Sequence, residues 1–187
     1  LVTTIFISKY GTEAIAGYGV CARLEQTLIP LAFGVGGVLT STVGTNFGAK
    51  QFSRARNISW LGALIIAILA GIIGMTVFIF PSLWLGFFTT NPEAYIIGTL
   101  YLGIVGPFFP IFAFGKTLYF ASQGTGNMII PILGGITRLV IVSIVGFTSY
   151  YYSLEIKFLF FGIGIAMSSV GLILFINMFS KTWRPEK

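Results

Sequence analysis

The sequence has no histidine, no aspartate and a single cysteine, Cys21, among its 187 residues. These absences exclude an intrachain disulfide, a zinc site built on histidine and cysteine, a Ser-His-Asp triad and a pair of catalytic aspartates. Cys21 stands among small and aliphatic residues, and we interpret it as a packing residue rather than a nucleophile. The sequence therefore predicts a protein that is not an enzyme and that has no metal site and no cofactor.

Charged residues are also scarce, at 9% of the chain, whereas about 25% is usual in a soluble domain. Hydrophobic residues make up 56% and mean hydropathy is +0.94. At least four apolar blocks reach the roughly 20 residues that a helix needs to cross about 30 Å of hydrocarbon. The sequence therefore predicts an all-α integral membrane protein with the lipid bilayer as its main partner.

The formal net charge of +6 does not indicate a nucleic-acid partner. Binding along a phosphate backbone needs a continuous basic surface. Here the basic residues lie in short segments between the apolar blocks and at the C-terminus, as membrane orientation requires. We therefore expect that the protein does not bind nucleic acid.

The apolar blocks predict a single transmembrane lobe, residues 1–187, made of about five helices plus a partial one. The stretch 1–8 is too short to cross the bilayer, and we interpret it as the end of a truncated helix. Glycine, proline and asparagine mark the ends of the blocks. The expected spans are 14–43, 58–80, 93–122, 128–150 and 158–179.

The basic residues outside the spans are distributed unevenly between the two sides of the membrane. One side collects six of them, and the other side has only Lys9 and Lys157. An excess of lysine and arginine marks the cytoplasmic side. We therefore expect a multi-pass protein of the cell membrane with a cytoplasmic C-terminus. The six residues are Lys50, Arg54, Arg56, Lys181, Arg184 and Lys187.

Four charged residues lie inside the expected spans and away from their ends: Arg23, Glu25, Lys116 and Arg138. A charge at membrane depth costs at least a few kcal/mol, so such a side chain faces protein or water and is a candidate for function. The alternative for each is a structural ion pair or a side chain that extends to the membrane surface. We select all four as candidate residues of a substrate or ion pathway.

Arg23 and Glu25 are two positions apart, which places them about 200° apart around a helix. Glu25 shares its face with apolar residues, and we expect it to point into packed protein and to hold and release a proton. Arg23 begins a stripe of polar or small residues at three- and four-residue spacing, which is typical of a wall along an aqueous path. That stripe is made of Arg23, Gln26, Thr27, Pro30, Gly34, Gly37, Ser41, Gly44, Thr45 and Gly48.

Lys116 has aromatic residues at neighbouring helical positions, and aromatic faces stabilise a cation. Tyr119 and Gln123 follow on the same span and are further pathway candidates. Arg138 lies deep in its span, and its alternative role is a structural anchor between helices.

Three prolines inside the spans are expected to break the helices: Pro30, Pro107 and Pro110. In a membrane the freed backbone groups need partners from neighbouring helices or a cavity. Broken helices near the middle of the membrane indicate the binding site of a secondary transporter.

Four runs of the sequence resemble the multidrug and toxic compound extrusion (MATE) family. They are GTEAIAGYGVCARLE at 11–25, VGTNFGA at 43–49, FTTNPE at 88–93 and SQGTGN at 122–127. They occur in the family's order and cover nearly the whole chain. Family members have twelve helices in two related six-helix lobes. The resemblance implies that this chain is the second lobe, from the end of helix seven to helix twelve, with the N-terminal lobe as its missing partner.

The resemblance also implies a function, the export of small organic compounds, often cationic, in exchange for protons or sodium. One departure concerns the coupling ion. Sodium-coupled members carry an acid in the tenth helix, about three turns before a Gly-x-Gly motif. Here that region reads FAFG at 112–115, followed by Lys116, which leaves Glu25 as the only acid inside the expected spans and away from their ends.

A second function is left open by the same residues. A flippase for lipid-linked saccharides, from the same broad superfamily, would use a strongly basic cavity. Arg23, Lys116 and Arg138 would supply the positive charge of such a cavity.

Overall fold

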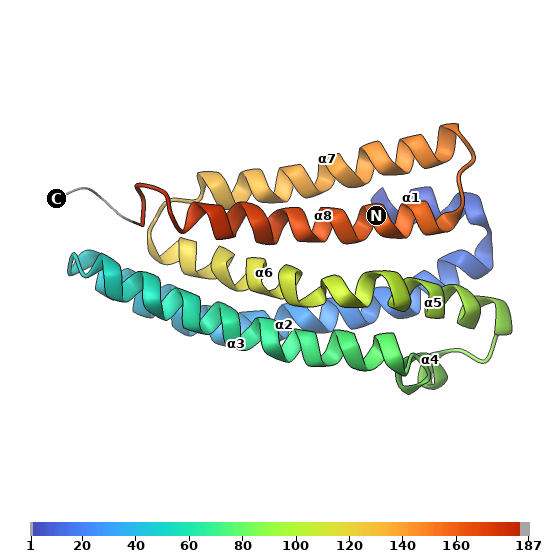
Figure 1. Cartoon of the computed structure of the whole chain (residues 1–187), viewed down its shortest axis with the longest axis horizontal. Helices are drawn as coiled ribbons and strands as arrows, with labels where there is room; N and C mark the ends of the chain where they lie inside the picture. The colour runs from blue at the N-terminus through green and yellow to red at the C-terminus, as the bar shows by residue number, and fades with distance from the viewer. Residues whose placement is uncertain (1, 184–187) are drawn as a thin grey trace.

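Figure 1 shows the computed structural model of the chain, which describes residues 2–183. These residues form helices joined by short turns, without a strand among them, and the long helices run side by side along one axis. The expected all-α architecture is confirmed. The elements are α1 (Val2–Ile7), η1 (Ser8–Tyr10), α2 (Thr12–Gly48), α3 (Phe52–Ile79), α4 (Ser82–Phe88), α5 (Pro92–Val105), η2 (Gly106–Phe108), α6 (Phe109–Gly124), α7 (Ile129–Tyr151) and α8 (Ile156–Asn177).

Five helical stretches in the described part of the chain are long and apolar enough to cross a membrane, the number that the sequence predicts. One of them joins two helices, α5 and α6, through the short 3-10 helix η2. The five stretches are Thr12–Gly48, Phe52–Ile79, Pro92–Gly124, Ile129–Tyr151 and Ile156–Asn177.

The junction between α2 and α3 is more helical than the sequence indicates. α2 continues to Gly48, past the expected end at residue 43. The side chains of Thr45 and Asn46 donate to carbonyl oxygens one turn earlier, at 3.0 and 2.8 Å, and so remain within the helix. α3 begins at Phe52 rather than at residue 58, because the basic segment carries good helix formers and buries Ala55.

The three prolines differ in their effect on the backbone. Pro107 lies in η2, which separates α5 from α6, and Pro110 occupies the first turn of α6, where its missing N–H costs little. α2 continues through Pro30, where the sequence predicts a break. A proline removes one hydrogen bond, and the remaining bonds of this 37-residue helix keep it continuous.

α6 lies at the centre of the lobe, packed against α2, α3 and α8. Glycines make these close approaches possible. A Cβ added at Gly115 would lie 2.8 Å from the Cα and 2.9 Å from the N of Gly171, both backbone atoms of α8. Small residues at such crossings let membrane helices approach through their backbones.

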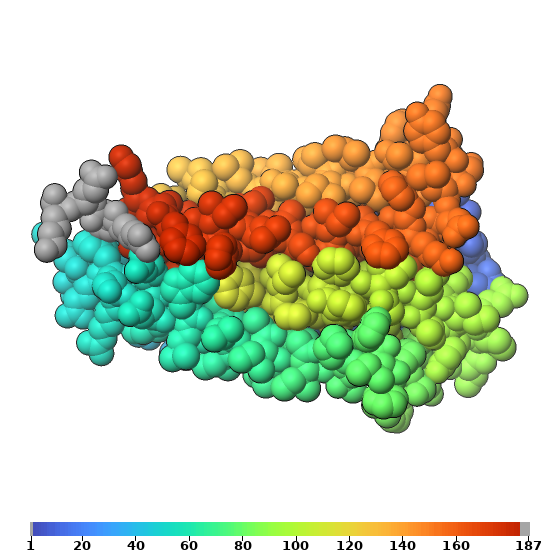
Figure 2. Space-filling model, viewed as in Figure 1, coloured from blue at the N-terminus to red at the C-terminus, as the bar shows by residue number. Residues whose placement is uncertain are grey.

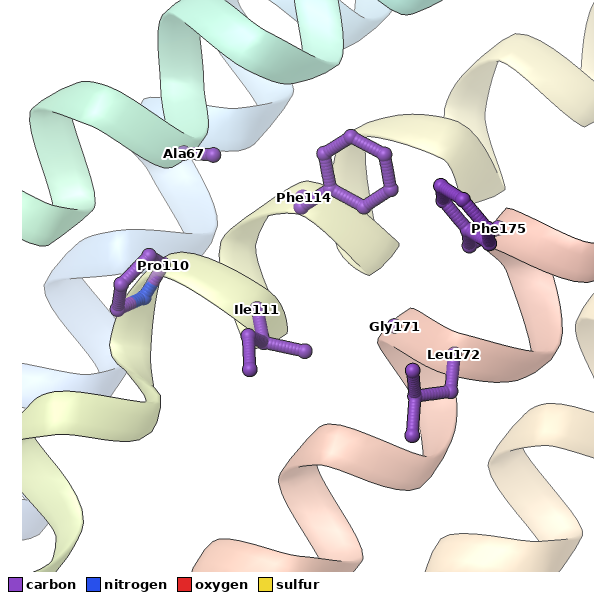
Figure 3. Close-up of a pocket in the computed structure, with 7 residues that line it drawn as sticks. All are labelled: Ala67, Pro110, Ile111, Phe114, Gly171, Leu172 and Phe175. Carbon is purple, nitrogen blue, oxygen red and sulfur yellow. The ribbon is translucent and has the colours of Figure 1, made fainter.

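The face that Figure 2 shows is formed by α3, α6 and α8, with α7 along one edge. From Leu61 to Ile79, the outward side chains of α3 are almost all large and apolar, which suits contact with lipid. A shallow apolar groove runs between α3, α6 and α8, and Figure 3 shows the side chains that line it. They are Ala67, Pro110, Ile111, Phe114, Gly171, Leu172 and Phe175.

The substitution Gly115→Ala is expected to destabilise the purified protein by about 1–3 kcal/mol, the usual cost of overpacking a close contact. The added methyl group would meet backbone atoms of Gly171, which cannot rotate away. Gly103→Ala is the matched control, because no atom lies within 4 Å of a Cβ built there. Thermal unfolding in detergent measures both, and equal melting temperatures for the two variants would contradict the tight α6–α8 crossing.

Candidate functional site

The outward face of α2 differs in chemistry from that of α3. The stripe that begins at Arg23 lies on the exposed surface of α2, apart from Gly44, which is half-buried. Hydrocarbon offers no partners to such polar side chains. This face of the lobe is therefore suited to water or to another protein surface rather than to lipid. The guanidinium of Arg23 lies 5.7 Å from the ring centre of Phe88, on α4.

Glu25 lies on the other side of α2 and is 9% exposed. The fully buried hydroxyl of Tyr101, on α5, donates a hydrogen bond to its carboxylate. Two aromatic rings hold Tyr101 in place by edge-to-face contacts, Tyr18 at 5.4 Å and Phe160 at 4.9 Å between ring centres. The carboxylate of Glu25 is thus positioned by residues from three helices.

Glu25 also lines a hollow of about 360 Å³ between α1, α2, α7 and α8. Arg138 lines the same hollow from α7, together with Tyr18. The carboxylate and the guanidinium form no ion pair in residues 2–183, where the one salt bridge joins Lys157 to Glu155. Both charges therefore face a space that water or a ligand can occupy. The remaining lining residues are Val2, Thr3, Gly135, Leu139, Val142 and Ile163.

Lys116 and Arg138 meet at one aromatic ring, that of Phe112 on α6. The Nζ of Lys116 lies 5.5 Å from the ring centre, and the guanidinium carbon of Arg138 lies 4.9 Å from it. Lys116 also lies 6.0 Å from the ring centre of Tyr119. Each cation is stabilised by an aromatic face. Through these contacts the Arg138 side chain of α7 reaches α6 on the side of the lobe that carries the hollow.

Lys116, Tyr119 and Gln123 share one face of α6 by their three- and four-residue spacing. Phe120, beside them, packs edge-to-face against Phe33 of α2 at 5.4 Å. The face therefore lies between α2 on one side and Arg138 of α7 on the other. Lys116 and Tyr119 are half-buried, and Gln123 is exposed.

The structure thus separates the candidate residues into two groups. Glu25, Arg138 and Lys116 are linked through the hollow and Phe112, with Tyr119 beside Lys116. Arg23 and Gln26 lie apart from them on the outward face of α2, together with Pro30. Within residues 2–183, no three histidine, cysteine, aspartate or glutamate side chains are grouped to hold a metal ion.

The sequence does not identify Tyr101 or Tyr18 as site residues, whereas Phe112 is one of the aromatic neighbours expected to stabilise Lys116. An aromatic residue in an apolar run has the same pattern as an ordinary core residue. The one available signal was Glu25 itself, because a buried carboxylate needs a hydrogen-bond donor. That requirement does not say which helix supplies the donor.

Comparison with known proteins identifies relatives among transporters. The model of the MatE family matches residues 1–148. "Probable multidrug resistance protein NorM" of Thermotoga maritima is 29% identical over 126 residues, which are 66% of this chain and 26% of the relative. "Probable multidrug resistance protein YoeA" of Bacillus subtilis is 23% identical over 184 residues, 97% of this chain and 40% of the relative. The chain therefore spans two fifths or less of these curated relatives.

Two solved structures share the fold. The Vibrio cholerae MATE transporter VcmN, in its bent form, has a TM-score of 0.83 at 18% identity, over 97% of this chain and 42% of that one. A MOP superfamily transporter from Pyrococcus furiosus has a TM-score of 0.76 at 20% identity, over 97% of this chain and 40% of that one. The reverse polarity of the binding pocket in that second transporter suggests a different function for it.

Removing the hydroxyl that binds Glu25, in Tyr101→Phe, is expected to lower the free energy of unfolding by about 1.5–3 kcal/mol, the range for a hydrogen bond to a charged group. Tyr95→Phe makes the same change on the same helix, at a hydroxyl without a hydrogen-bond partner in the described residues. It should change stability by less than about 0.5 kcal/mol. Equal melting temperatures in detergent would show that the Tyr101–Glu25 bond is unimportant for folding.

Proposed function

Because the chain belongs to the MatE family, we propose that it is the C-terminal lobe of an antiporter that exports small organic compounds, often cationic, in exchange for protons or sodium. Members of this family are transporters rather than enzymes. The observation that carries the proposal is Glu25. It is the one carboxylate in residues 2–183 that lies away from the helix ends and loops, and it faces a hollow.

The polar face of α2 supports the same proposal. Secondary transporters bind their substrates between two repeats, near the middle of the membrane. In the complete protein, the stripe that begins at Arg23 would face the N-terminal lobe across such a cleft. This arrangement accounts for polar residues along a helix that would otherwise expose them to lipid. The apolar face of α3 would then remain on the lipid side.

Glu25 would hold the coupling ion, because a carboxylate can take up a proton or help to bind sodium. Tyr101 would orient the carboxylate toward the hollow. Arg138 would supply a fixed positive charge in the same space. Transport driven by one ion gradient at a time, with dyes of opposite charge, distinguishes the coupling ion and the class of substrate.

Glu25→Gln in the full-length protein is expected to abolish or strongly reduce ion-driven export while leaving the melting temperature nearly unchanged. The amide keeps the shape of the side chain but cannot cycle an ion. Export of ethidium and of fluorescein from vesicles, driven by a proton or sodium gradient, measures the effect. Glu93→Gln is the control, because Glu93 is an exposed residue at the start of α5.

Two other outcomes of the Glu25 experiment have different meanings. If Glu25→Gln is lost from the membrane or melts far lower, the carboxylate is a structural partner of a buried cation such as Arg138. If transport and stability are both normal, Glu25 takes no part in the mechanism. Measuring transport and melting together separates these cases.

The proposed location is the cell membrane, with the α2–α3 junction and the C-terminus in the cytoplasm. Lys50, Arg54 and Arg56 lie at the junction, and Lys181 follows the end of α8. Figure 1 places the α2–α3 turn and the end of α8 at the same end of the bundle. Arg184 and Lys187, which also support this orientation, lie outside the described residues. At the opposite end, Lys9 donates hydrogen bonds to the carbonyl oxygen of Tyr150 and to Ser153.

The orientation predicts that Ser53→Cys, in a Cys21→Ala background, resists membrane-impermeant maleimide in intact cells and reacts in opened membranes. Ser53 is exposed beside the basic residues of the α2–α3 junction. Ser153→Cys, in the α7–α8 turn, is the control for the other side and should react in intact cells. Labelling of position 53 from outside the cell would show that the topology is the reverse of the one proposed.

A second candidate function is a flippase for lipid-linked saccharides. The observation in its favour is that neither Lys116 nor Arg138 forms a salt bridge within residues 2–183. A positively charged cavity would suit a lipid phosphate. Ion-driven export of soluble dyes by the full-length protein would favour the antiporter over this candidate.

A further inference from the structure

The charges in the interior of the lobe do not balance. Away from the span ends, the described spans contain three cations, Arg23, Lys116 and Arg138, against one carboxylate, Glu25. Arg23 lies on the outward face of α2, and Glu25 accepts its hydrogen bond from Tyr101. That single carboxylate lines the same hollow as Arg138 without forming a salt bridge to it, so it cannot balance both Arg138 and Lys116.

Aromatic contact compensates these two cations only in part. Both lie over the ring of Phe112, at 5.5 and 4.9 Å from its centre, so two like charges share one aromatic residue. A ring face stabilises a cation, but by less than a charge costs at membrane depth. Like charges held close together also repel each other, and an anion between them would remove both costs.

The two cationic groups are also accessible. Arg138 lines the hollow between α1, α2, α7 and α8, and neither side chain has a nitrogen that is both buried and unpartnered. The surroundings are mainly apolar or aromatic, with Tyr119 beside Lys116, while Leu139, Val142 and the carboxylate of Glu25 line the hollow together with Arg138. A ligand here would meet positive charge and apolar surface together.

We propose that Lys116 and Arg138, which meet over Phe112, form a binding site for the anionic group of an amphiphilic organic compound. The anionic group is a carboxylate, sulfonate or phosphate, and the apolar part of the compound packs against Tyr119 and the exposed side chain of Leu139. A guanidinium and an ammonium give charge-assisted hydrogen bonds to such oxygens. The inference rests on the proposed function, because it names a substrate class for the same lobe.

The test compares two dyes on one scaffold, in the full-length protein held in nanodiscs of phosphatidylcholine. Fluorescein is an anion, and tetramethylrhodamine methyl ester is a cation with the same xanthene core. Lys116→Gln and Arg138→Gln should each weaken fluorescein binding by about tenfold, the effect of losing one charge-assisted contact. Binding of the cationic dye should be unchanged or tighter. Fluorescence anisotropy measures both.

Two kinds of control keep the result interpretable. Lys157→Gln removes the same charge from an exposed residue at the start of α8 and should leave fluorescein binding unchanged. Lys116→Arg keeps the charge and should retain binding, so a loss caused by misfolding is recognised. If both glutamine variants bind fluorescein as the unmodified protein does, the site does not exist.

Competition identifies the source of the anion. Farnesyl pyrophosphate and inorganic pyrophosphate carry the same anionic group, with and without a lipid chain. Displacement of fluorescein by both indicates a soluble organic anion as the ligand, whereas displacement by farnesyl pyrophosphate alone indicates a lipid-linked one. If neither compound displaces fluorescein, the proposal that the site binds a phosphate group is wrong.

Different results would contradict the proposed anion site and the proposed antiport activity. If the glutamine variants melt much lower and bind fluorescein normally, Lys116 and Arg138 are paired with acids of the remaining part of the protein, and the anion site is wrong. Ion-driven export of ethidium by the unmodified protein would still support the antiporter in that case. Loss of all ion-driven export from the unmodified protein, with charge-dependent fluorescein binding, would instead reject the antiporter and retain the site.

Discussion

Hydrocarbon offers no hydrogen bond and no counter-charge, so each polar group inside the lobe has to be satisfied by protein, by water or by a ligand. This constraint divides the molecule. The α3–α6–α8 face is covered mainly with large apolar side chains, and an apolar groove runs along it. Polar and charged groups gather instead on α2, on one face of α6 and along the hollow against α7. The two faces of the lobe therefore differ because charged groups are stable only where protein, water or a ligand can reach them.

Close helix packing determines which way the charged face of α6 points. Gly115 contacts the backbone of Gly171, so this side of α6 is in contact with α8. Lys116 is the next residue and is turned by about 100° from that contact. It consequently points away from the α8 backbone and reaches Phe112 and Tyr119. A change at the glycine crossing would rotate or displace Lys116, so the packing of α6 and the chemistry of the site depend on each other.

The sequence was sufficient for features that repeat along the chain and insufficient for those that depend on a partner from elsewhere. Long apolar blocks predict the all-α architecture with five spans, because a membrane fixes the length and polarity of each helix. The expected spans 14–43 and 58–80 stop short of the helix ends at 48 and 52, because polar side chains can bond within a helix as well as end it. The Tyr101–Glu25 bond joins residues 76 positions apart, and one sequence holds no signal for such a pairing.

Arg138 connects the two proposed sites, since it lines the hollow with Glu25 and also lies over Phe112 with Lys116. A coupling cation bound at Glu25 would neutralise the carboxylate and leave the charge of Arg138 less compensated, which favours an anion beside Arg138. A cationic compound in the same hollow would instead compete with the coupling cation. Because linkage between binding sites is reciprocal, cationic and anionic compounds should respond in opposite directions to the coupling ion. The sign of that response identifies which class of compound uses the hollow during transport.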